Sequence, residues 1–212
     1  DDTGSRLGNT ETLWGRKTAL RYTPTSGDRF YLSMDRGFKV GGVNMDDEVP
    51  DDFRVFDTET LWNYELGWRT VRNNGQFRSD LSLFYMQRKD MQVDSSFQTG
   101  DGNTFALYKD NAASGINYGV EWSLSWNVND NWKLFGSLGY LKAEFEDYTY
   151  VDPTDNSSIV NLDGAEQGYA PTYTYRAGTE LTFANGFFSE LSIHGRDAYV
   201  FEINSGSELD QY

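Results

Sequence analysis

Ser192 and His194 are the first residues to consider for catalysis, because His194 is the single histidine of the chain. A hydroxyl nucleophile needs a base within hydrogen-bond reach and a third group that orients the base. Residues at i and i+2 of a strand share a face, but two such residues are not a triad. A lone histidine of this kind is more often part of a wall. The sequence therefore predicts that the protein is not an enzyme.

Acidic side chains gather in two stretches, one from Asp46 to Asp52 and one from Glu144 to Asp163. Carboxylates attract hard divalent cations, but the spacing of an EF-hand loop is missing. Charge runs usually solvate a loop, so we predict no metal site, with a specific cation site as the alternative. The chain has no cysteine for a thiolate site, and we predict no cofactor.

The net charge of −15 bears on the partners of the chain. Nucleic-acid binding requires clustered Lys and Arg to neutralise phosphates. We therefore predict that nucleic acid is not a partner.

Charged residues of both signs recur on the polar sides of the strands that are predicted below. Mixed charges on neighbouring strands are typical of a hydrated wall that is braced by ion pairs. A few of them could instead contact an anionic or hydroxyl-rich ligand. The predicted wall residues are Glu65, Arg69, Arg78, Asp80, Glu121, Arg176, Glu180 and His194.

Aromatic residues in the long polar stretches are the predicted ligand contacts. Such side chains offer stacking area, and Tyr adds a polar group, at a low cost in conformational entropy. The alternative is that they pack the loops against one another. The predicted ligand-binding residues are Phe97, Tyr108, Tyr148, Tyr150 and Tyr169.

The elements that must position these residues are predicted to be strands. From Ile116 to Trp126, apolar and polar residues alternate without a break, which is typical of a strand whose two faces meet different surroundings. The run is about twice the usual strand length and reaches the roughly 9–11 residues that cross a membrane. Similar runs lie at 62–68, 77–85, 132–140 and 173–183, and less clear ones at 14–22, 30–34 and 187–193.

Connections between these runs alternate in length. Short polar links lie at 24–28, 72–75, 129–131 and 185–186, whereas long stretches without strong periodicity lie at 37–58, 94–114 and 146–170. This alternation predicts an up-and-down meander. Outer-membrane barrels have the same asymmetry, with short turns on the periplasmic side and long loops outside.

Aromatic residues on the apolar side of the strands form two predicted membrane girdles. About eight residues of strand separate the rows, and with a tilt of about 40° they rise on the order of 20 Å, close to the roughly 25 Å apolar band of a barrel. A soluble β-sandwich, the alternative, explains the alternation but not the paired rows. The girdle residues are Tyr22, Trp68, Phe77, Trp126, Trp132 and Phe183 beside the short turns, and Tyr85, Tyr118, Tyr140 and Tyr175 farther away.

Five stretches resemble a known family in their order and spacing. DRGFKVGGVN at 35–44 resembles SRGFKxGGxN, and ETLWNYELG at 59–67 resembles PExxxxYELGxK. NAASGINYGVE at 111–121 resembles NAGxAxxxGxExE, GSLGY at 136–140 matches the strand that follows, and YAP at 169–171 precedes a strand as in the same family. These are motifs of the TonB-dependent outer-membrane receptors, and the resemblance covers nearly the whole chain.

This resemblance implies an all-β, antiparallel up-and-down transmembrane β-barrel. About eight strands are expected here, out of about 22 in a complete receptor. Residues 1–212 would form one partial barrel domain, with the plug domain and the C-terminal strands outside this chain. Open sheet edges are not tolerated in lipid, so the alternative is that these strands close into a small barrel.

The resemblance also implies a function. Extracellular loops would capture a scarce ligand at the outer membrane of a Gram-negative bacterium, and the TonB complex would drive its import through the plug. The implied partners are outer-membrane lipid, the TonB complex and a small-molecule metal chelate or other nutrient. A ferric siderophore is the commonest such ligand; haem, cobalamin and oligosaccharide stay open. The alternative function is a small passive, structural or adhesive outer-membrane barrel.

Overall fold

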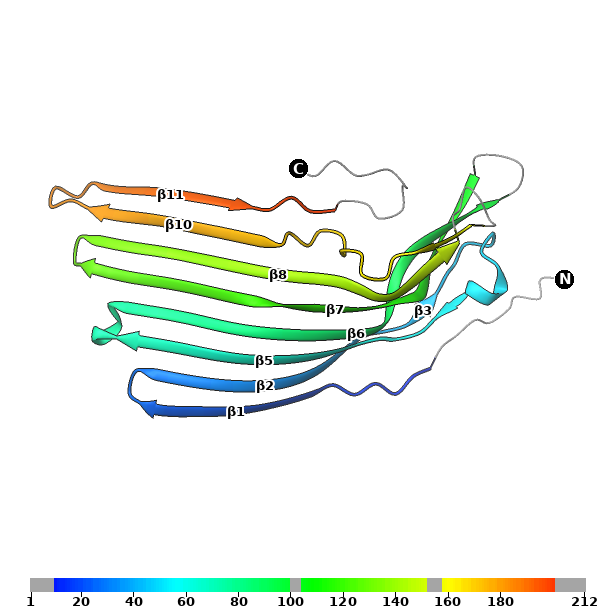
Figure 1. Ribbon diagram of the computed structural model, residues 1–212, viewed down its shortest axis with the longest axis horizontal. Coiled ribbons are helices and arrows are strands. Elements are labelled where there is room, and N and C mark those ends of the chain that lie inside the picture. Colours follow the sequence, from blue (N-terminus) through cyan, green and yellow to red (C-terminus); the bar gives the residue numbers. More distant parts are fainter. Residues whose placement is uncertain (1–9, 100–103, 152–157, 201–212) are drawn as a thin grey trace.

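The computed structural model describes residues 10–99, 104–151 and 158–200. Most of its strands form one large sheet, with short turns at one end and longer connections at the other (Figure 1). The long strands are β1 (Arg16–Thr25), β2 (Asp28–Lys39), β5 (Glu59–Arg72), β6 (Phe77–Thr99), β7 (Thr104–Asn129), β8 (Trp132–Val151), β10 (Tyr173–Thr182) and β11 (Phe188–Arg196). The short elements are β3 (Gly42–Val43), β4 (Val55–Phe56), β9 (Ile159–Asn161) and the 3₁₀ turns η1 (Asp51–Phe53) and η2 (Asn73–Gly75). In these ranges, no helix has the length and apolar character to cross a membrane.

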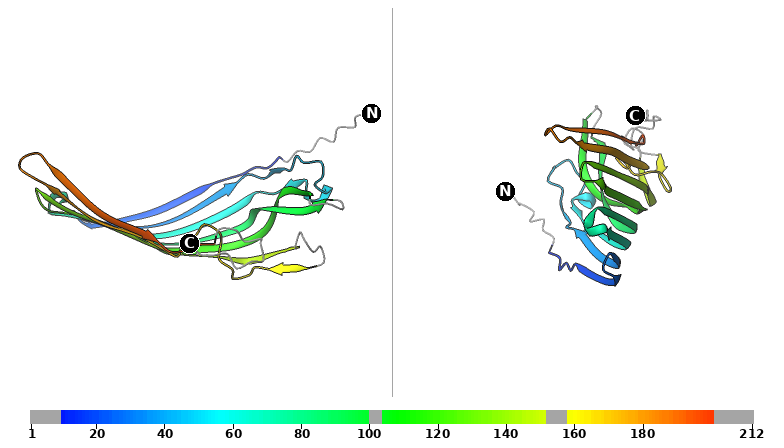
Figure 2. Two further views of the ribbon diagram at one scale, coloured as in Figure 1. Left: turned by 90° about the horizontal axis from the view of Figure 1, so that it is seen from above. Right: turned by 90° about the vertical axis from the view of Figure 1, so that its left-hand side faces the viewer.

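The long strands cross the sheet in chain order, β1-β2-β5-β6-β7-β8-β10-β11, and each neighbouring pair is antiparallel. The remaining strand of this sheet, β9, pairs with the end of β8. The prediction of an all-β, antiparallel up-and-down sheet is confirmed. The sheet is curved (Figure 2), and within the described ranges β1 and β11 are its two edges, so these strands do not close on themselves.

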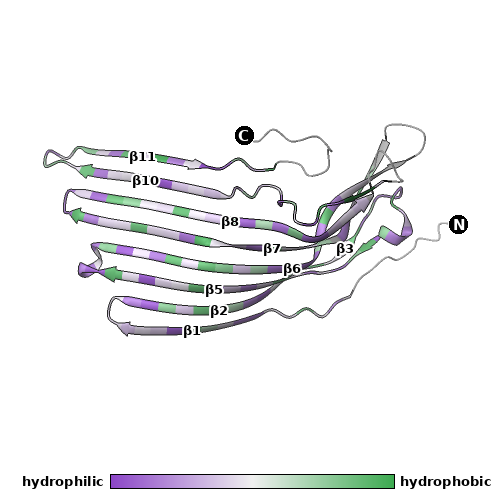
Figure 3. Cartoon of the chain, viewed as in Figure 1, coloured by the Kyte–Doolittle hydropathy of each residue, from purple (hydrophilic) through white to green (hydrophobic). Residues whose placement is uncertain are grey.

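The register between strands extends the alternation of each strand across the whole sheet. Side chains point to opposite faces at successive positions, and Figure 3 shows this alternation as bands along the strands. Several rows of paired residues across the sheet are therefore uniformly apolar or uniformly polar. An apolar row from β1 to β10 consists of Leu20, Leu32, Leu66, Leu83, Val120, Tyr140 and Tyr173. A polar row from β2 to β11 on the opposite face consists of Arg29, Arg69, Asp80, Ser123, Ser137, Arg176 and His194.

Phe84 interrupts the polar phase of β6, and its cross-strand neighbour explains why. Gly119 stands opposite Phe84 on β7, and a Cβ at that glycine would lie 2.8 Å from the ring carbon Cζ of Phe84. The ring therefore lies over the glycine and covers its backbone, as aromatic residues often do beside glycine in strands. Tyr31 over Gly67 and Phe135 over Gly178 repeat this relationship on the same face.

The two ends of the sheet differ in the length of their connections. At the short-turn end, Asn73, Asn74 and Gly75 adopt φ angles of 51°, 53° and 92°, which Asn and Gly tolerate better than other residues. At the long-loop end, the loop predicted at 94–114 is wrong, because β6 continues to Thr99 and β7 begins at Thr104. After a register irregularity between Arg88 and Met91, this hairpin bends away from the sheet (Figure 1). The predicted loop at 146–170 begins as the last part of β8.

Candidate functional site

The polar face of the sheet holds an open hollow of about 440 Å³ that extends over β2, β5, β6, β7, β8 and β10. Tyr31 donates a hydrogen bond of 2.5 Å to Glu65 Oε1, and Arg69 forms an ion pair with Asp80. Glu121 lies beside these pairs in the lining. The hollow can therefore receive polar groups, and much of its charge is already paired.

A second set of charges lies toward β11 on the same face. Lys133 pairs with Glu180 at 2.7 Å, and Arg176 pairs with Glu190 at 3.4 Å. The cations of Lys133 and Arg176 also lie 5.6 and 4.9 Å from the ring centroid of Phe135, within cation–π range. Four of the eight predicted wall residues, Arg69, Asp80, Arg176 and Glu180, thus occur in opposite-charge pairs. Arg78 is exposed near the short turn, and His194 is exposed on β11.

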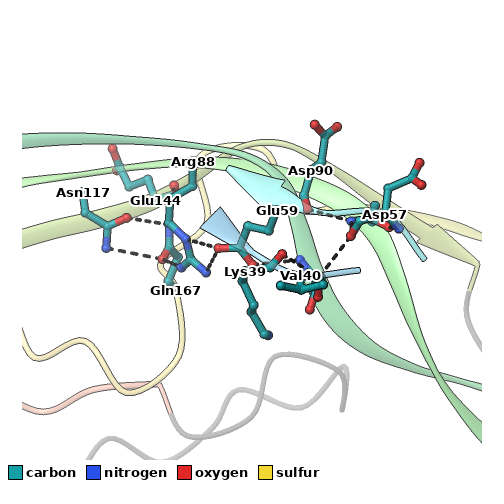
Figure 4. Close-up of polar contacts among 11 residues, drawn as sticks. Lys39, Val40, Asp57, Glu59, Arg88, Asp90, Asn117, Glu144 and Gln167 are labelled. Atoms are coloured by element: carbon teal, nitrogen blue, oxygen red, sulfur yellow. Dashed lines mark hydrogen bonds and ion pairs between the residues drawn. The ribbon is translucent and has the colours of Figure 1, made fainter. Parts of the chain in front are cut away.

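A continuous polar network crosses the long-loop end of the sheet (Figure 4). We call it the rim network, and it consists of Glu59, Arg88, Gln92, Asn111, Asn117 and Gln167. At its centre, Arg88 Nε and Nη2 donate to Glu59 Oε1 at 2.9 and 2.5 Å. Glu59 is only 6% exposed. A buried carboxylate requires such a partner, because its unpaired charge would be costly to remove from water.

One arm of the rim network reaches the connection between β2 and β5. The Gln92 backbone N–H donates to Glu59 Oε2 at 3.1 Å. Gln92 Nε2 donates to the carbonyls of Lys39, Val40 and Asp57 at 3.2, 2.9 and 3.0 Å. Asn111 bonds the backbone of Asp57 in both directions, as donor at 2.9 Å and as acceptor at 2.5 Å. Side chains of β6 and β7 therefore fix both ends of this connection.

Asn44 fixes the middle of the same connection independently of the rim network. Its Nδ2 donates to the carbonyls of Phe53 and Lys109 at 2.6 and 2.8 Å, and its Oδ1 accepts from the Lys109 N–H at 2.9 Å. The rings of Phe53 and Tyr108 lie 4.9 Å apart, tilted by 45°. The β2–β5 connection is thereby held against the β6–β7 hairpin.

The other arm of the rim network reaches the segment between β9 and β10. Arg88 Nη1 donates to Gln167 Oε1 at 3.5 Å, and Gln167 Nε2 donates to the carbonyl of Glu144 at 2.9 Å. Asn117 Nδ2 donates to Gln167 Oε1 at 3.4 Å. Gln167 is 7% exposed, so its amide is enclosed by these partners.

Two predicted ligand contacts, Tyr148 and Tyr150, belong to an apolar cluster beside this segment. Tyr148 is 3% exposed and packs with Met91, Ala113 and Phe145. Its ring centroid lies 4.9 Å from that of Phe145 and 5.8 Å from that of Tyr150. Burial raises the pKa of the Tyr148 phenol to about 12. These contacts favour the alternative in which the aromatic residues pack the loops together.

The other predicted ligand contacts lie in different surroundings. Tyr169 is 64% exposed, has a φ of 60° and lies 6.0 Å from the ring of Tyr199. Tyr108 is half-buried against Phe53, and its pKa is raised by burial. The side chain of Phe97 lies outside the described residues. The described ligand contacts thus differ in their surroundings: Tyr148 and Tyr150 share one aromatic group with Phe145, Tyr108 packs on Phe53, and Tyr169 is the most accessible.

The predicted girdle residues lie on the apolar face. Aromatic pairs bridge its strands, with Phe30 and Trp68 6.3 Å apart and Tyr85 and Tyr118 6.5 Å apart. Trp122 and Trp132 donate their indole N–H groups to Ser79 and Thr179 at 2.9 and 2.8 Å. The apolar face therefore exposes rings whose polar groups are partly satisfied within the sheet.

Two further possibilities in the sequence were catalysis at Ser192 and His194 and metal binding by clustered acidic side chains. His194 stands opposite Arg176, and Ser192 stands opposite Gly178, so neither faces a carboxylate directly across the sheet. Among the residues that the structure describes, no group of three or more His, Cys, Asp or Glu side chains is arranged to hold a metal ion.

A curved antiparallel meander with one apolar and one polar face is the wall of an up-and-down β-barrel. The family described as "TonB dependent receptor-like, beta-barrel" matches residues 2–210 of the sequence. The chain belongs to this family, as the motifs in the sequence suggested.

Solved structures of receptors have the same fold. The ferric yersiniabactin uptake receptor FyuA from Yersinia pestis matches with a TM-score of 0.66 and 21% identity, over 88% of this chain and 26% of that one. The siderophore receptor PiuA from Acinetobacter baumannii matches with a TM-score of 0.64 and 14% identity, over 86% of this chain and 26% of that one. The ferric-catecholate import receptor Fiu from E. coli K12 matches with a TM-score of 0.58 and 15% identity, over 84% of this chain and 24% of that one. The chain spans about a quarter of the length of these receptors.

Sequence reasoning did not predict the rim network. Asn44, Glu59 and Asn111 appear in it or beside it, and their only signal was membership of the family motifs. Gln92 and Gln167 carried no signal, because an isolated glutamine in a polar stretch has no periodicity to mark it. The register of the strands and the paths of the connections bring these residues together.

Proposed function

We propose that this chain forms part of the barrel wall of a Gram-negative outer-membrane receptor that imports a ferric siderophore or a similar iron chelate. In this proposal, a plug domain outside the chain fills the lumen, and the TonB complex supplies the energy. Family membership and the likeness to receptors whose names specify ferric uptake support the proposal. Its class is a transport receptor rather than an enzyme.

The observation that carries the membrane part of this proposal is the exposed apolar face. Leu20 and Leu66 are 69% and 52% exposed, in a row that is apolar across seven strands from β1 to β10. Contiguous apolar surface of this extent mediates contact with lipid or another protein. Outer-membrane lipid is the proposed partner, with the two aromatic rows at the interfaces. The polar face would then line the lumen.

The long-loop end would be extracellular and would carry the ligand-capturing surface. Tyr169 is its proposed ligand contact, because its ring is exposed and stands beside Tyr199. Tyr148, Tyr150 and Tyr108 would support that surface through packing. The wall residues, such as Arg69 and Asp80, would brace the lumen beside the plug.

The test is uptake of radioiron by the native host with the full-length gene intact, deleted or restored. Iron presented as different ferric chelates should enter only when the gene and TonB are both present. In the purified full-length protein, Tyr169→Ala should weaken chelate binding by about tenfold, or about 1.4 kcal/mol. Uptake of haem, cobalamin or an oligosaccharide instead would change the ligand class. Diffusion that is independent of TonB would favour the passive barrel.

A further inference from the structure

We propose that the Glu59–Arg88 ion pair mechanically couples two connections at the long-loop end, residues 40–58 and 158–172. The pair stands between them, with one arm of the rim network reaching each. A displacement of one connection would then change the order of the other. This inference concerns the coupling itself and does not require that the proposed ligand is correct.

The first arm connects Arg88 to residues 40–58 through the Glu59 carboxylate, both of whose oxygens accept hydrogen bonds. Glu59 Oε1 accepts from Arg88, and Oε2 accepts from the Gln92 N–H at 3.1 Å. The Gln92 side chain then bonds carbonyls at both ends of the 40–58 connection. Because the Glu59 side chain is 8% exposed, water cannot readily replace a lost donor. A shift of Arg88 therefore reaches residues 40–58.

The second arm connects Arg88 to residues 158–172 through the side-chain amide of Gln167. Its oxygen accepts from Arg88 and Asn117, and its nitrogen donates to Glu144. The Gln167 N–H also donates to the carbonyl of Ala143 at 2.9 Å. The segment beyond Gln167 carries Tyr169, the exposed aromatic residue of this end. A shift of Arg88 therefore reaches the position of Tyr169 as well.

Sharing of one guanidinium group is the physical basis of the coupling. Arg88 uses Nε and Nη2 on Glu59, and Nη1 on Gln167. The guanidinium group of arginine is planar and rigid, so it cannot reorient toward one partner without breaking its hydrogen bonds to the other. The two connections consequently share one donor group, whereas Asn44 and Asn161 each act on a single connection.

The experiment is hydrogen–deuterium exchange of the full-length receptor in detergent micelles without ligand, followed in peptides from 40–58 and 158–172. Gln167→Leu removes one arm while leaving the ion pair intact. We expect exchange to rise about fivefold in both segments, because loss of a buried hydrogen bond lowers the local opening free energy. Peptides at the short turn 183–187 should be unchanged and report that the barrel is folded.

Two further variants complete the design. Asn161→Ala, the matched control, removes a side-chain contact within 158–172 and should raise exchange there alone. Arg88→Met should raise exchange in both segments, and Arg88→Lys replaces it if the unpaired Glu59 prevents folding. Unchanged exchange in 40–58 for Gln167→Leu, with a rise in 158–172, would overturn the coupling. A failure of iron-chelate uptake would overturn the proposed function but leave this result intact.

Discussion

The ring of Tyr31 covers Gly67 on the neighbouring strand, so that a Cβ on this glycine would collide with the ring carbons Cε1 and Cζ and with the hydroxyl oxygen Oη. The same hydroxyl donates to Glu65. One aromatic side chain thus covers the backbone at a glycine and holds a carboxylate of the polar face in position.

Replacing Gly67 by Val should therefore destabilise the barrel. The ring has to leave its position, and overpacking of this kind costs about 1–3 kcal/mol. Urea unfolding of the full-length protein in micelles measures the loss. Gly37→Ala is the control, since a Cβ there meets nothing within 4 Å, and equal losses in the two variants would contradict the explanation.

Ser79→Ala should leave the indole N–H of Trp122 without its 2.9 Å acceptor. Because a lost partner in lipid or a buried site is not replaced by water, we expect a loss of about 1 kcal/mol. Trp122→Phe removes the donor, so Ser79→Ala should cost little in that background. The four unfolding free energies form a double-mutant cycle, and a coupling energy near zero would exclude the hydrogen bond as a stabilising contact.

Arginine should have different effects on the two faces of β6. Leu83 belongs to the apolar row, and Ser82 lines the polar hollow opposite Glu121. If the apolar face meets lipid, Leu83→Arg should cost about 2–4 kcal/mol near the middle of the bilayer. Ser82→Arg should cost clearly less, since Glu121 can pair with the new cation. Unfolding of both variants from lipid vesicles gives the comparison, and the opposite order would mean that the faces are assigned the wrong way round.

Tyr148 should make the long-loop end sensitive to alkali. Its side chain lies past the apolar band, eight positions along β8 from Tyr140. Its folded pKa of about 12 exceeds the value of about 10 for an unfolded tyrosine. The neutral Tyr148 phenol therefore contributes its full stabilisation of the folded state below about pH 10. This contribution is lost as the pH rises through about 12, because the phenol ionises at a lower pH in the unfolded chain.

Tyr148→Phe removes this ionisation while keeping the ring. Protease resistance of the full-length protein at pH 9 and pH 11 should fall more in the unmodified protein than in the variant. A fall of the same size in both would assign the alkaline sensitivity to other tyrosines.

Much of the sheet was predictable because each strand carries its own signal. Ile116 to Trp126 lies within β7, and the runs around Trp62, Phe77 and Trp132 lie within β5, β6 and β8. The hairpin beyond Arg88 was missed because polar residues occur on both of its faces, which removes the period of two. Phe84 looked like an irregularity because its explanation, Gly119, lies on another strand.

The candidate site was less predictable for the same reason. Glu59 and Arg88 are separated by 29 positions, and Arg88 and Gln167 by 79. No local pattern relates residues at such distances; their contact depends on strand register and on the path of the last connection. The buried position of Tyr148 likewise depends on Met91 and Phe145, which reach it through the register of three strands.

The rim network also limits how freely the connections can be exchanged between barrels. A graft of residues 40–58 onto a foreign wall would lose the side chains of Gln92 and Asn111 that hold its ends. It would also lose the backbone N–H and C=O of Lys109, which are placed to bond Asn44. A portable unit would have to include the rim positions of β5, β6 and β7 together with the connection. The smallest exchangeable module of this barrel is thus a group of strands with their shared polar side chains, rather than a single loop.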